Sequence, residues 1–258
     1  MTDKLPISVC ILCKNEEDRL RACLEVLEPF KEVLVMDTGS ADSSVGLAQS
    51  YEYVTLIEES WQGFALSRRS LFNKATQPWI FWLDADEVLS GELIAELKRL
   101  MVKDLKNEAY EINRMVFFED QWIKHGLWFP DWNVRLFKQG CWDMPEREVH
   151  ESLEITGQID RLQGLIYHYT YRDWADQRQR SIKYATLWAK QKKKEGKESS
   201  LGKAVVRSSW AFMRSYFLKK GCLDGYLGFK IAIAVSKEVY LKHSLLFQMR
   251  KSEGGASH

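Results

Sequence analysis

The stretch Pro78-Trp-Ile-Phe-Trp-Leu-Asp-Ala-Asp-Glu87 is an apolar run that stops at a group of carboxylates. Its first six residues predict a buried strand, because the run is short, apolar and rich in aromatic side chains. Three carboxylates at the end of a strand repel one another, and gathering them is costly unless a cation stabilises them. The stretch therefore predicts a strand of an α/β sheet that ends at a cation-binding turn.

Asp84 and Asp86 are the candidate metal ligands in this turn. Two aspartates separated by one residue direct their carboxylates to a shared edge, and hard oxygen ligands of this kind suit Mg²⁺ or Mn²⁺. Such a metal ion bridges a diphosphate and neutralises a leaving group. The alternative is an acidic helix N-terminus, because Ser90 and Glu92 could begin a helix nearby.

Two upstream runs also end in polar residues. The run Ile7–Cys13 precedes Lys14-Asn-Glu16, and the run Val33–Met36 precedes Asp37. From the same periodicities we expect strands at 7–13, 33–36, 53–57 and 78–83, and helices at 15–27 and 63–75. This alternation predicts a mostly parallel sheet with helices on both faces, and a ligand crevice at the carboxyl ends of its strands.

The polar residues at these strand ends are candidate ligands for a nucleotide. Asp37 is placed to accept hydrogen bonds from a base or a ribose, and Asn15 and Glu16 follow the neighbouring strand. Structural alternatives exist for each position. Asn15 could cap the next helix and Asp37 could shape a turn, while Asp42 begins a good capping sequence and is expected to cap.

The net charge of +1 hides an uneven distribution along the chain. Residues 1–177 carry 19 Lys and Arg against 31 Asp and Glu, whereas residues 178–251 carry 18 against 4. The basic segment indicates an anionic partner or a lysine-rich solvated face. Because aromatic residues accompany the cations, an anionic membrane surface is the expected partner. No nucleic acid is expected, since no recognised binding module is present.

Cysteine usage and hydropathy indicate the compartment. The five cysteines are scattered, and Cys10 and Cys13 are the only close pair. A zinc site would need a second Cys or His pair at ligand spacing, and the sequence has none. The amino terminus lacks a signal region, and no run approaches 18 uninterrupted apolar residues. We therefore expect a protein of a reducing compartment, the cytoplasm, that is neither secreted nor inserted across a membrane.

Three motifs of the first half resemble the nucleotide-sugar half of the family 2 inverting glycosyltransferases with the GT-A fold: Cys13-Lys-Asn-Glu16, Asp37-Thr-Gly-Ser-Ala-Asp42 and Trp82-Leu-Asp-Ala-Asp-Glu87. Three later motifs resemble the subgroup that contains bacterial lipopolysaccharide-core glucosyltransferases: Pro130-Asp-Trp-Asn-Val-Arg-Leu-Phe137, Val149-His-Glu151 and Ile166-Tyr-His-Tyr169. The resemblance spans about residues 7–245.

The resemblance implies an α/β GT-A fold, a Rossmann-like sheet with flanking helices, plus a helical extension. It places a GT-A domain at 1–177, with a donor half at about 1–105 and an acceptor half at about 106–177, and a basic helical extension at 178–258. It implies metal-dependent transfer of a sugar, glucose in the most specific version, from a UDP-sugar. The acceptor would be a hydroxyl of a saccharide or a lipid-linked saccharide, such as the lipopolysaccharide inner core. The resemblance therefore also implies a peripheral protein at the cytoplasmic face of the inner membrane.

The resemblance also implies roles for individual residues. The metal-bound diphosphate would lie at Asp84 and Asp86. Arg68 matches a basic position of the family, although Arg69 stands where the family usually has Asn, and a surface arginine is the alternative for Arg68. The donor-binding set is Cys13, Asn15, Glu16, Asp37, Ser40, Arg68, Asp84, Ala85 and Asp86.

An inverting transfer needs a carboxylate, remote from the metal, that deprotonates the acceptor hydroxyl. Glu151 is the first candidate because it ends an irregular segment on the acceptor side, and Glu148 and Asp131 are the alternatives. Arg135 could bind an acidic acceptor or the diphosphate, because a guanidinium binds phosphate as a fork. Further candidates on the acceptor or diphosphate side are His150 and Trp132, and His168 could close the site.

Two other functions compete with this interpretation. A nucleotidyltransferase also uses a metal-binding carboxylate pair, but it would normally have a glycine-rich phosphate loop after the first strand, and Lys14-Asn-Glu-Glu17 is not one. A non-catalytic, basic membrane-binding or nucleic-acid-binding protein is the second alternative. The presence of Asp84, Asp86 and Glu16 argues against it.

Overall fold

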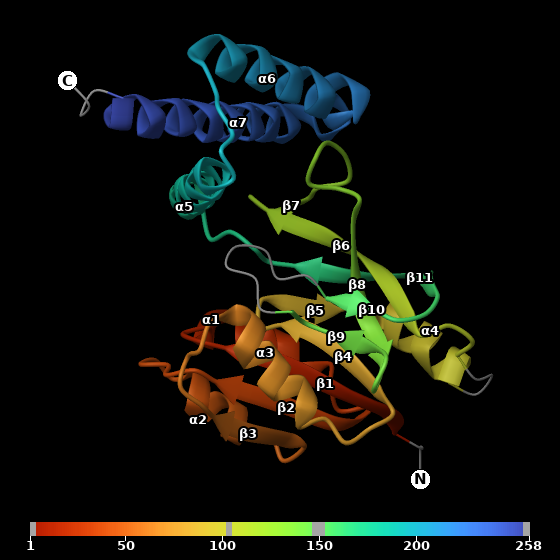
Figure 1. Ribbon diagram of the computed structural model, residues 1–258. Coiled ribbons are helices and arrows are strands. Elements are labelled where there is room, and N and C mark those ends of the chain that lie inside the picture. Colours follow the sequence, from red (N-terminus) through yellow and green to blue (C-terminus); the bar gives the residue numbers. More distant parts are fainter. Residues whose placement is uncertain (1–3, 102–104, 146–152, 255–258) are drawn as a thin grey trace. The chain divides into compact units, whose positions relative to one another are not determined.

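The computed structural model describes residues 4–101, 105–145 and 153–254 (Figure 1). The chain forms two compact units that are interleaved in sequence. The first comprises Met1–Arg114 and Asp131–Thr170, and the second comprises Met115–Pro130 and Tyr171–His258. The expected division at residue 177 stays a prediction.

The first half of the first unit is a parallel sheet with crossover helices. Its strands lie in the order β3-β2-β1-β4, and each neighbouring pair is parallel. The strands are β1 (Leu5–Cys13), β2 (Phe30–Asp37), β3 (Val54–Glu58) and β4 (Trp79–Asp84), and the helices are α1 (Glu17–Glu25), α2 (Ser44–Gln49) and α3 (Phe64–Asn73). These elements confirm the strand and helix pattern expected from the apolar runs.

Beyond β4 the sheet becomes antiparallel. The order continues β4-β8-β6-β11-β5, with antiparallel pairing of β4 to β8, β8 to β6 and β11 to β5. Parallel neighbours need long crossovers, usually helical, and after α4 (Gly91–Met101) the first unit continues mainly as strands. The strands are β5 (Glu87–Leu89), β6 (Ala109–Phe118), β8 (Asp131–Lys138) and β11 (Ile159–His168). The sheet as a whole is therefore mixed, and the expectation of a mostly parallel sheet holds only for β3-β2-β1-β4.

Three short strands complete the set. β7 (Gln121–Trp122) pairs with the end of β6, and β9 (Trp142–Asp143) pairs with β10 (Glu154–Ile155).

The core lies on both faces of the sheet, because successive strand residues point to opposite sides. On β1, Val9 and Ile11 join a cluster with α1 and α4, whereas Cys10 joins a second cluster with Leu71 and Phe72 of α3. The five cysteines are free thiols. Burial raises the pKa of the Cys13 thiol to about 12, which keeps it protonated and unreactive.

The second unit contains the long helices α5 (Trp174–Lys194), α6 (Leu201–Met213) and α7 (Gly225–Gly254). The π-helical turn η1 (Arg214–Leu218) and the 3₁₀ turn η2 (Gly221–Asp224) join α6 to α7. Asp173 caps α5 by accepting from the Asp176 N–H, and Ser200 caps α6 by accepting from the Lys203 N–H. Within the described residues, no helix combines the length and apolarity needed to cross a membrane.

Gly164 of β11 is expected to be essential for packing against α4. A Cβ at this position would stand 2.4 Å from the Leu93 Cα atom, which belongs to the helix backbone. Gly164→Ala should lower the free energy of unfolding by about 1–3 kcal/mol through overpacking, measured by urea denaturation. Gly46→Ala in α2 is the control, because no atom lies within 4 Å of its added Cβ, and it should stabilise the protein slightly. Equal stability of the two variants would contradict this account.

Candidate active site

The turns that follow β1 and β2 are joined by hydrogen bonds. The Asn15 N–H donates to the Ser40 hydroxyl at 2.9 Å, and the Asn15 side-chain oxygen accepts from the Ala41 N–H at 2.8 Å. The Glu16 N–H donates to the Ser44 hydroxyl at 2.9 Å. Asn15 has φ of 56°, a left-handed conformation that asparagine tolerates. The two predicted donor-binding segments therefore form one connected surface.

The two aspartates of the second turn have different surroundings. Asp37 is buried, and its carboxylate accepts from the N–H groups of Gly39 and Ser40, both at 2.9 Å, and contacts the Ser40 hydroxyl. This carboxylate shapes its own turn, so its expected contact with a nucleotide stays a prediction. Asp42 accepts from the N–H groups of Ser44 and Glu17 at 3.0 and 3.2 Å, the first residues of α2 and α1, but the N-cap of α2 is Ser43, so the expected N-cap at Asp42 is wrong by one residue.

Asp84, at the end of β4, is bound by two arginines and an indole. Arg68 and Arg135 donate to its two carboxylate oxygens at 3.0 and 2.9 Å, and the Trp82 N–H donates at 3.1 Å. Burial by itself would raise the pKa of Asp84, but the positive charges of Arg135 and Arg68 outweigh burial and hold this pKa well below the usual aspartate range. Asp84 is therefore a permanent anion between two cations.

The Trp82 ring lies close to both arginines. The guanidinium carbons of Arg68 and Arg135 lie 4.4 and 4.8 Å from the ring centroid. Cation–π attraction of this kind holds a guanidinium in place while leaving some of its N–H groups available. In Arg135 the Nε and one terminal nitrogen are buried and have no hydrogen-bond partner among the described residues. These N–H groups suit an anionic ligand.

Glu87 is the fully buried centre of a chain of ion pairs. Its carboxylate accepts from Arg135 at 2.6 Å, from Arg114 at 3.1 Å and from the backbone N–H of Asp84 at 3.0 Å. Arg114 in turn donates twice to Asp131, at 2.9 and 2.6 Å. The third carboxylate of the opening motif thus has a structural role.

Asp131, one of the candidate bases, faces this network. Besides the two bonds from Arg114, its carboxylate accepts from the Asn133 side chain at 2.9 Å. A carboxylate that already accepts three hydrogen bonds, two of them from a guanidinium, is poorly suited to remove a proton. The other two candidate bases, Glu148 and Glu151, lie outside the described residues, as does His150.

Asp86 is held more loosely than Asp84. Its carboxylate lies 3.4 Å from an Arg19 nitrogen and 3.5 Å from the His168 Nε2. Arg19 also pairs with Glu16 at 3.3 Å, which links the turns after β1 and β4. The His168 Nδ1 is buried without a hydrogen-bond partner among the described residues.

The described residues contain no group of three or more His, Cys, Asp or Glu side chains arranged around a metal position. Asp84 has both oxygens engaged by arginines, whereas Asp86 and His168 have only long contacts. The Asp86 carboxylate suits a Mg²⁺ or Mn²⁺ ion that takes its remaining ligands from phosphates and water, whereas an imidazole is a ligand that Mg²⁺ does not favour.

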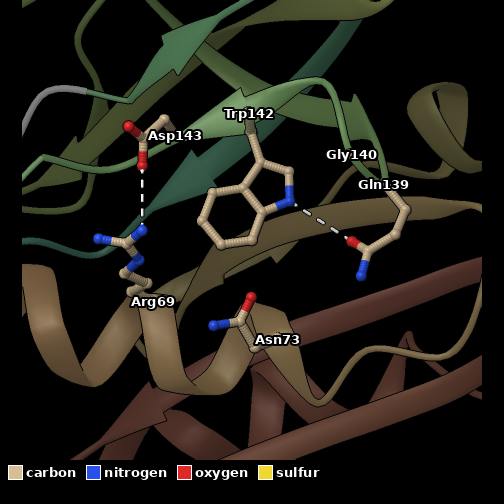
Figure 2. A pocket seen from close by; sticks show the side chains of 6 residues that line it. All are labelled: Arg69, Asn73, Gln139, Gly140, Trp142 and Asp143. Carbon is tan, nitrogen blue, oxygen red and sulfur yellow. Dashed lines mark hydrogen bonds and ion pairs between the residues drawn. The ribbon is translucent and has the colours of Figure 1, made fainter.

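Trp132, a predicted site residue, and Arg69, the neighbour of Arg68, make their contacts away from the carboxylates of Asp84 and Asp86. Trp132 follows Asp131 on β8, so the two side chains leave opposite faces, and its ring stacks on Arg161, 4.6 Å from the centroid. Arg69 pairs with Asp143 at 3.6 Å and lines a separate surface pocket with Trp142 (Figure 2). The buried donor-set residues Cys13 and Ala85 support the strand ends by packing.

Sequence reasoning missed Arg114 and Arg19. Arg114 interrupts an otherwise largely apolar strand, and it stands directly opposite Asp131 in the β6–β8 pairing. A lone arginine in such a strand was the available signal for a buried ion pair. Arg19 gave no comparable signal, since it lies on α1 among charged residues.

Comparisons with known proteins agree on one family. The family model described as glycosyl transferase family 2 matches residues 8–153. The lipopolysaccharide core biosynthesis glycosyltransferase LpsC of Rhizobium meliloti (strain 1021) is 28% identical over 264 residues, covering 95% of this chain and 96% of LpsC. An uncharacterized glycosyltransferase of Rickettsia typhi is 26% identical, covering 94% of this chain and 87% of that protein.

Two solved structures share the fold. The mannosyltransferase PcManGT from Pyrobaculum calidifontis, in complex with GDP-Man and Mn²⁺, has a TM-score of 0.52 and 11% identity, covering 94% of this chain and 87% of that chain. S. aureus TarS 1–349, in complex with UDP-GlcNAc, has a TM-score of 0.50 and 11% identity, covering 95% and 92%. The GT-A fold expected from the sequence is therefore confirmed.

Glu87→Gln is expected to destabilise the protein strongly, because it removes the buried charge that Arg135, which is buried, and Arg114, which is partly buried, share. The loss should be about 3 kcal/mol in the free energy of unfolding, measured by urea denaturation in metal-free buffer. Glu28→Gln is the matched control, since Glu28 forms an exposed pair with Lys4 at 3.2 Å, and it should change stability by less than about 1 kcal/mol. A Glu87 variant as stable as the control would show that the network contributes little.

Proposed function

The chain belongs to glycosyltransferase family 2, and on that premise we propose that it transfers a sugar, with inversion, from a UDP-sugar to a hydroxyl of a lipid-linked saccharide. The observation that carries the proposal is the cluster at the carboxyl ends of β1, β2 and β4. There, two arginines flank Asp84, and the loosely held Asp86 lies close to His168. Family membership disfavours both the nucleotidyltransferase and the non-catalytic alternatives.

The nucleotide part of the donor would bind at the turns after β1 and β2. Hydrogen bonds between Asn15, Ser40 and Ala41 keep these turns in one arrangement, which supports a preformed site. The diphosphate would lie toward Arg68 and Arg135. The buried N–H groups of Arg135 that have no described partner are suitable donors to phosphate oxygens.

A divalent cation would be held by Asp86, assisted by Asp84 and His168. A bound Mg²⁺ or Mn²⁺ ion neutralises charge on the diphosphate as it leaves. Few protein ligands are needed for such an ion, because substrate phosphates and water complete its coordination. Since Asp84 is already bound by arginines, we propose that it mainly positions Arg68 and Arg135.

The acceptor hydroxyl must lose its proton as its oxygen attacks the anomeric carbon from the face opposite the diphosphate. We propose Glu151 as the base, with Glu148 as the second candidate. Asp131 becomes the weakest of the three because its carboxylate binds Arg114 and Asn133.

The acceptor is proposed from the relationship to LpsC, whose name places it in lipopolysaccharide core biosynthesis. A core saccharide is anchored in lipid, so the enzyme would work at the cytoplasmic face of the inner membrane as a peripheral protein. Glucose is the first sugar to test. The nucleotide must be tested as well, because two solved structures with this fold hold different donors, GDP-Man and UDP-GlcNAc.

Release of UDP in the absence of acceptor tests the donor site directly. Wild-type protein should hydrolyse one UDP-sugar of a panel slowly, with activity that requires Mn²⁺ or Mg²⁺. Asp86→Ala should lower this rate at least about 100-fold, because it removes the proposed metal ligand. Asp160→Ala is the control, since Asp160 is an exposed aspartate that accepts from Asn107, and it should retain the wild-type rate.

Two results would contradict the proposal at different points. Metal-dependent release that survives in Asp86→Ala would remove Asp86 from the metal site. Absence of both UDP release and UDP binding by calorimetry, with every donor of the panel, would overturn the UDP-sugar assignment itself.

A further inference from the structure

Helix α6 packs on α7 through a stripe of small side chains. Ala204, Ser208 and Ala211, continued by Ser215 in η1, recur at helical spacing and are buried. The Ser236 hydroxyl of α7 donates to the Ser208 carbonyl at 2.9 Å, so the two helices lie in direct contact, as Figure 1 shows. The face of α6 that packs against α7 is thus lined by small residues.

The large apolar side chains of α6 lie on its opposite face. Val206, Trp210, Met213 and Phe217 repeat the same spacing two residues further along, which turns them by about 200° around the helix axis. Their exposed fractions are 69%, 59%, 47% and 52%. An ordinary surface helix buries its large apolar residues and exposes polar ones. Helix α6 instead buries small residues and exposes large apolar ones. We call Val206, Trp210, Met213 and Phe217 the exposed stripe.

The apolar surface continues around the elbow between α6 and α7. Leu218, Leu223 and Tyr226 are all more than half exposed there. Two glycines shape the elbow, because a Cβ on Gly228 would stand 1.9 Å from the Gly221 carbonyl oxygen. The exposed leucines therefore project from a closely packed turn.

The charge of this region has one sign. Residues 201–237 contain seven basic side chains and a single acid. That acid, Asp224, is buried and accepts from the His125 N–H at 2.9 Å. The basic residues are Lys203, Arg207, Arg214, Lys219, Lys220, Lys230 and Lys237. Lys230 is paired with Glu119 at 2.8 Å, so the apolar surface is bordered mainly by cations. Such a surface is complementary to a layer that combines hydrocarbon with negative charge.

We propose that the exposed stripe and the elbow leucines insert into the interfacial region of an anionic lipid bilayer. This inference deepens the proposed function, on which it rests for the presence of a lipid-anchored acceptor. A second copy of the chain is the less suitable occupant, because two such surfaces would bring like charges together. Trp210 and Tyr226, both exposed on this surface, are of the residue types that commonly lie at lipid headgroups.

The exposed stripe lies far from the three consecutive lysines at 192–194, near the end of α5. Arg250, near the end of α7, donates to the Lys193 carbonyl at 3.5 Å. Tyr226 of the elbow is 24 residues earlier in the same helix, a distance of about 36 Å along its axis. The run therefore lies at the other end of α7, and Lys192 is paired with Glu195 at 2.6 Å. Membrane contact is assigned to the elbow end.

Co-sedimentation of the full chain with vesicles tests this assignment. Wild-type protein should bind vesicles that contain phosphatidylglycerol more tightly than purely zwitterionic ones, and salt at about 1 M should weaken binding by screening. Trp210→Ser/Met213→Ser should lower the partition coefficient about tenfold or more. Tyr184→Ser/Leu187→Ser on α5 is the matched control, an aromatic and an aliphatic residue at the same spacing, 57% and 40% exposed, and it should bind as wild type.

Three outcomes would contradict the assignment of this surface to membrane binding. The first is that wild-type protein does not bind anionic vesicles, and the second is that both double variants lose vesicle binding equally. The third is that wild-type protein does not bind vesicles but forms a dimer in light scattering, and that only the Trp210/Met213 variant abolishes the dimer. Release of UDP without vesicles is measured in parallel and should be unchanged in both variants. If the wild-type protein releases UDP but does not bind vesicles, only the membrane-binding surface is rejected. If the wild-type protein binds vesicles but releases no UDP, only the proposed donor site is rejected.

Discussion

The buried carboxylate of Glu87 is the constraint on which the active-site half of the molecule depends. It lies on β5, accepts from Arg135 of β8 and Arg114 of β6, and binds the backbone N–H at the end of β4. A single charge thus connects the parallel and antiparallel parts of the sheet. Removing Glu87 would leave Arg135 with Asp84 and Arg114 with Asp131, and the interior would lose the negative charge that the two arginines share. The strands on either side are therefore fixed in relation to one another by electrostatics as well as by the backbone ladder.

This network also explains why two neighbouring aspartates behave differently. Asp84 receives two guanidinium groups and an indole N–H, and its charge is fully compensated by the protein. Asp86 has only long contacts, to Arg19 and His168. One carboxylate of the pair is committed to holding arginines, whereas the other remains suited to a ligand from outside. A pair of aspartates in sequence is thus divided into two environments in space.

The sequence was informative wherever the signal was local. The apolar runs that end at Cys13, Asp37 and Asp84 are each self-contained, so the parallel strands and the convergence of their ends could be predicted. The antiparallel order of β8, β6, β11 and β5 depends on pairing between distant segments, which periodicity does not specify. The same limit applies to the site. Arg135 was a candidate for binding an anion, but its position between Asp84 and Glu87 follows from a register of strands far apart in sequence.

The sequence separation within the Glu87 network has a consequence for the order of events during synthesis. A ribosome adds roughly 5–20 residues per second, so Arg135 is made about 2–10 seconds after Glu87. The helices and parallel strands that precede Glu87 can already pair with one another in that interval. The Glu87 carboxylate, however, still lacks Arg114 and Arg135, the two cations with which it pairs, and burying it is unfavourable until β6 and β8 arrive. Pairing of β5 with the rest of the sheet should therefore follow the synthesis of Arg114 and Arg135. During synthesis the parallel part of the sheet would form first, and the antiparallel part would be added once these two arginines are present.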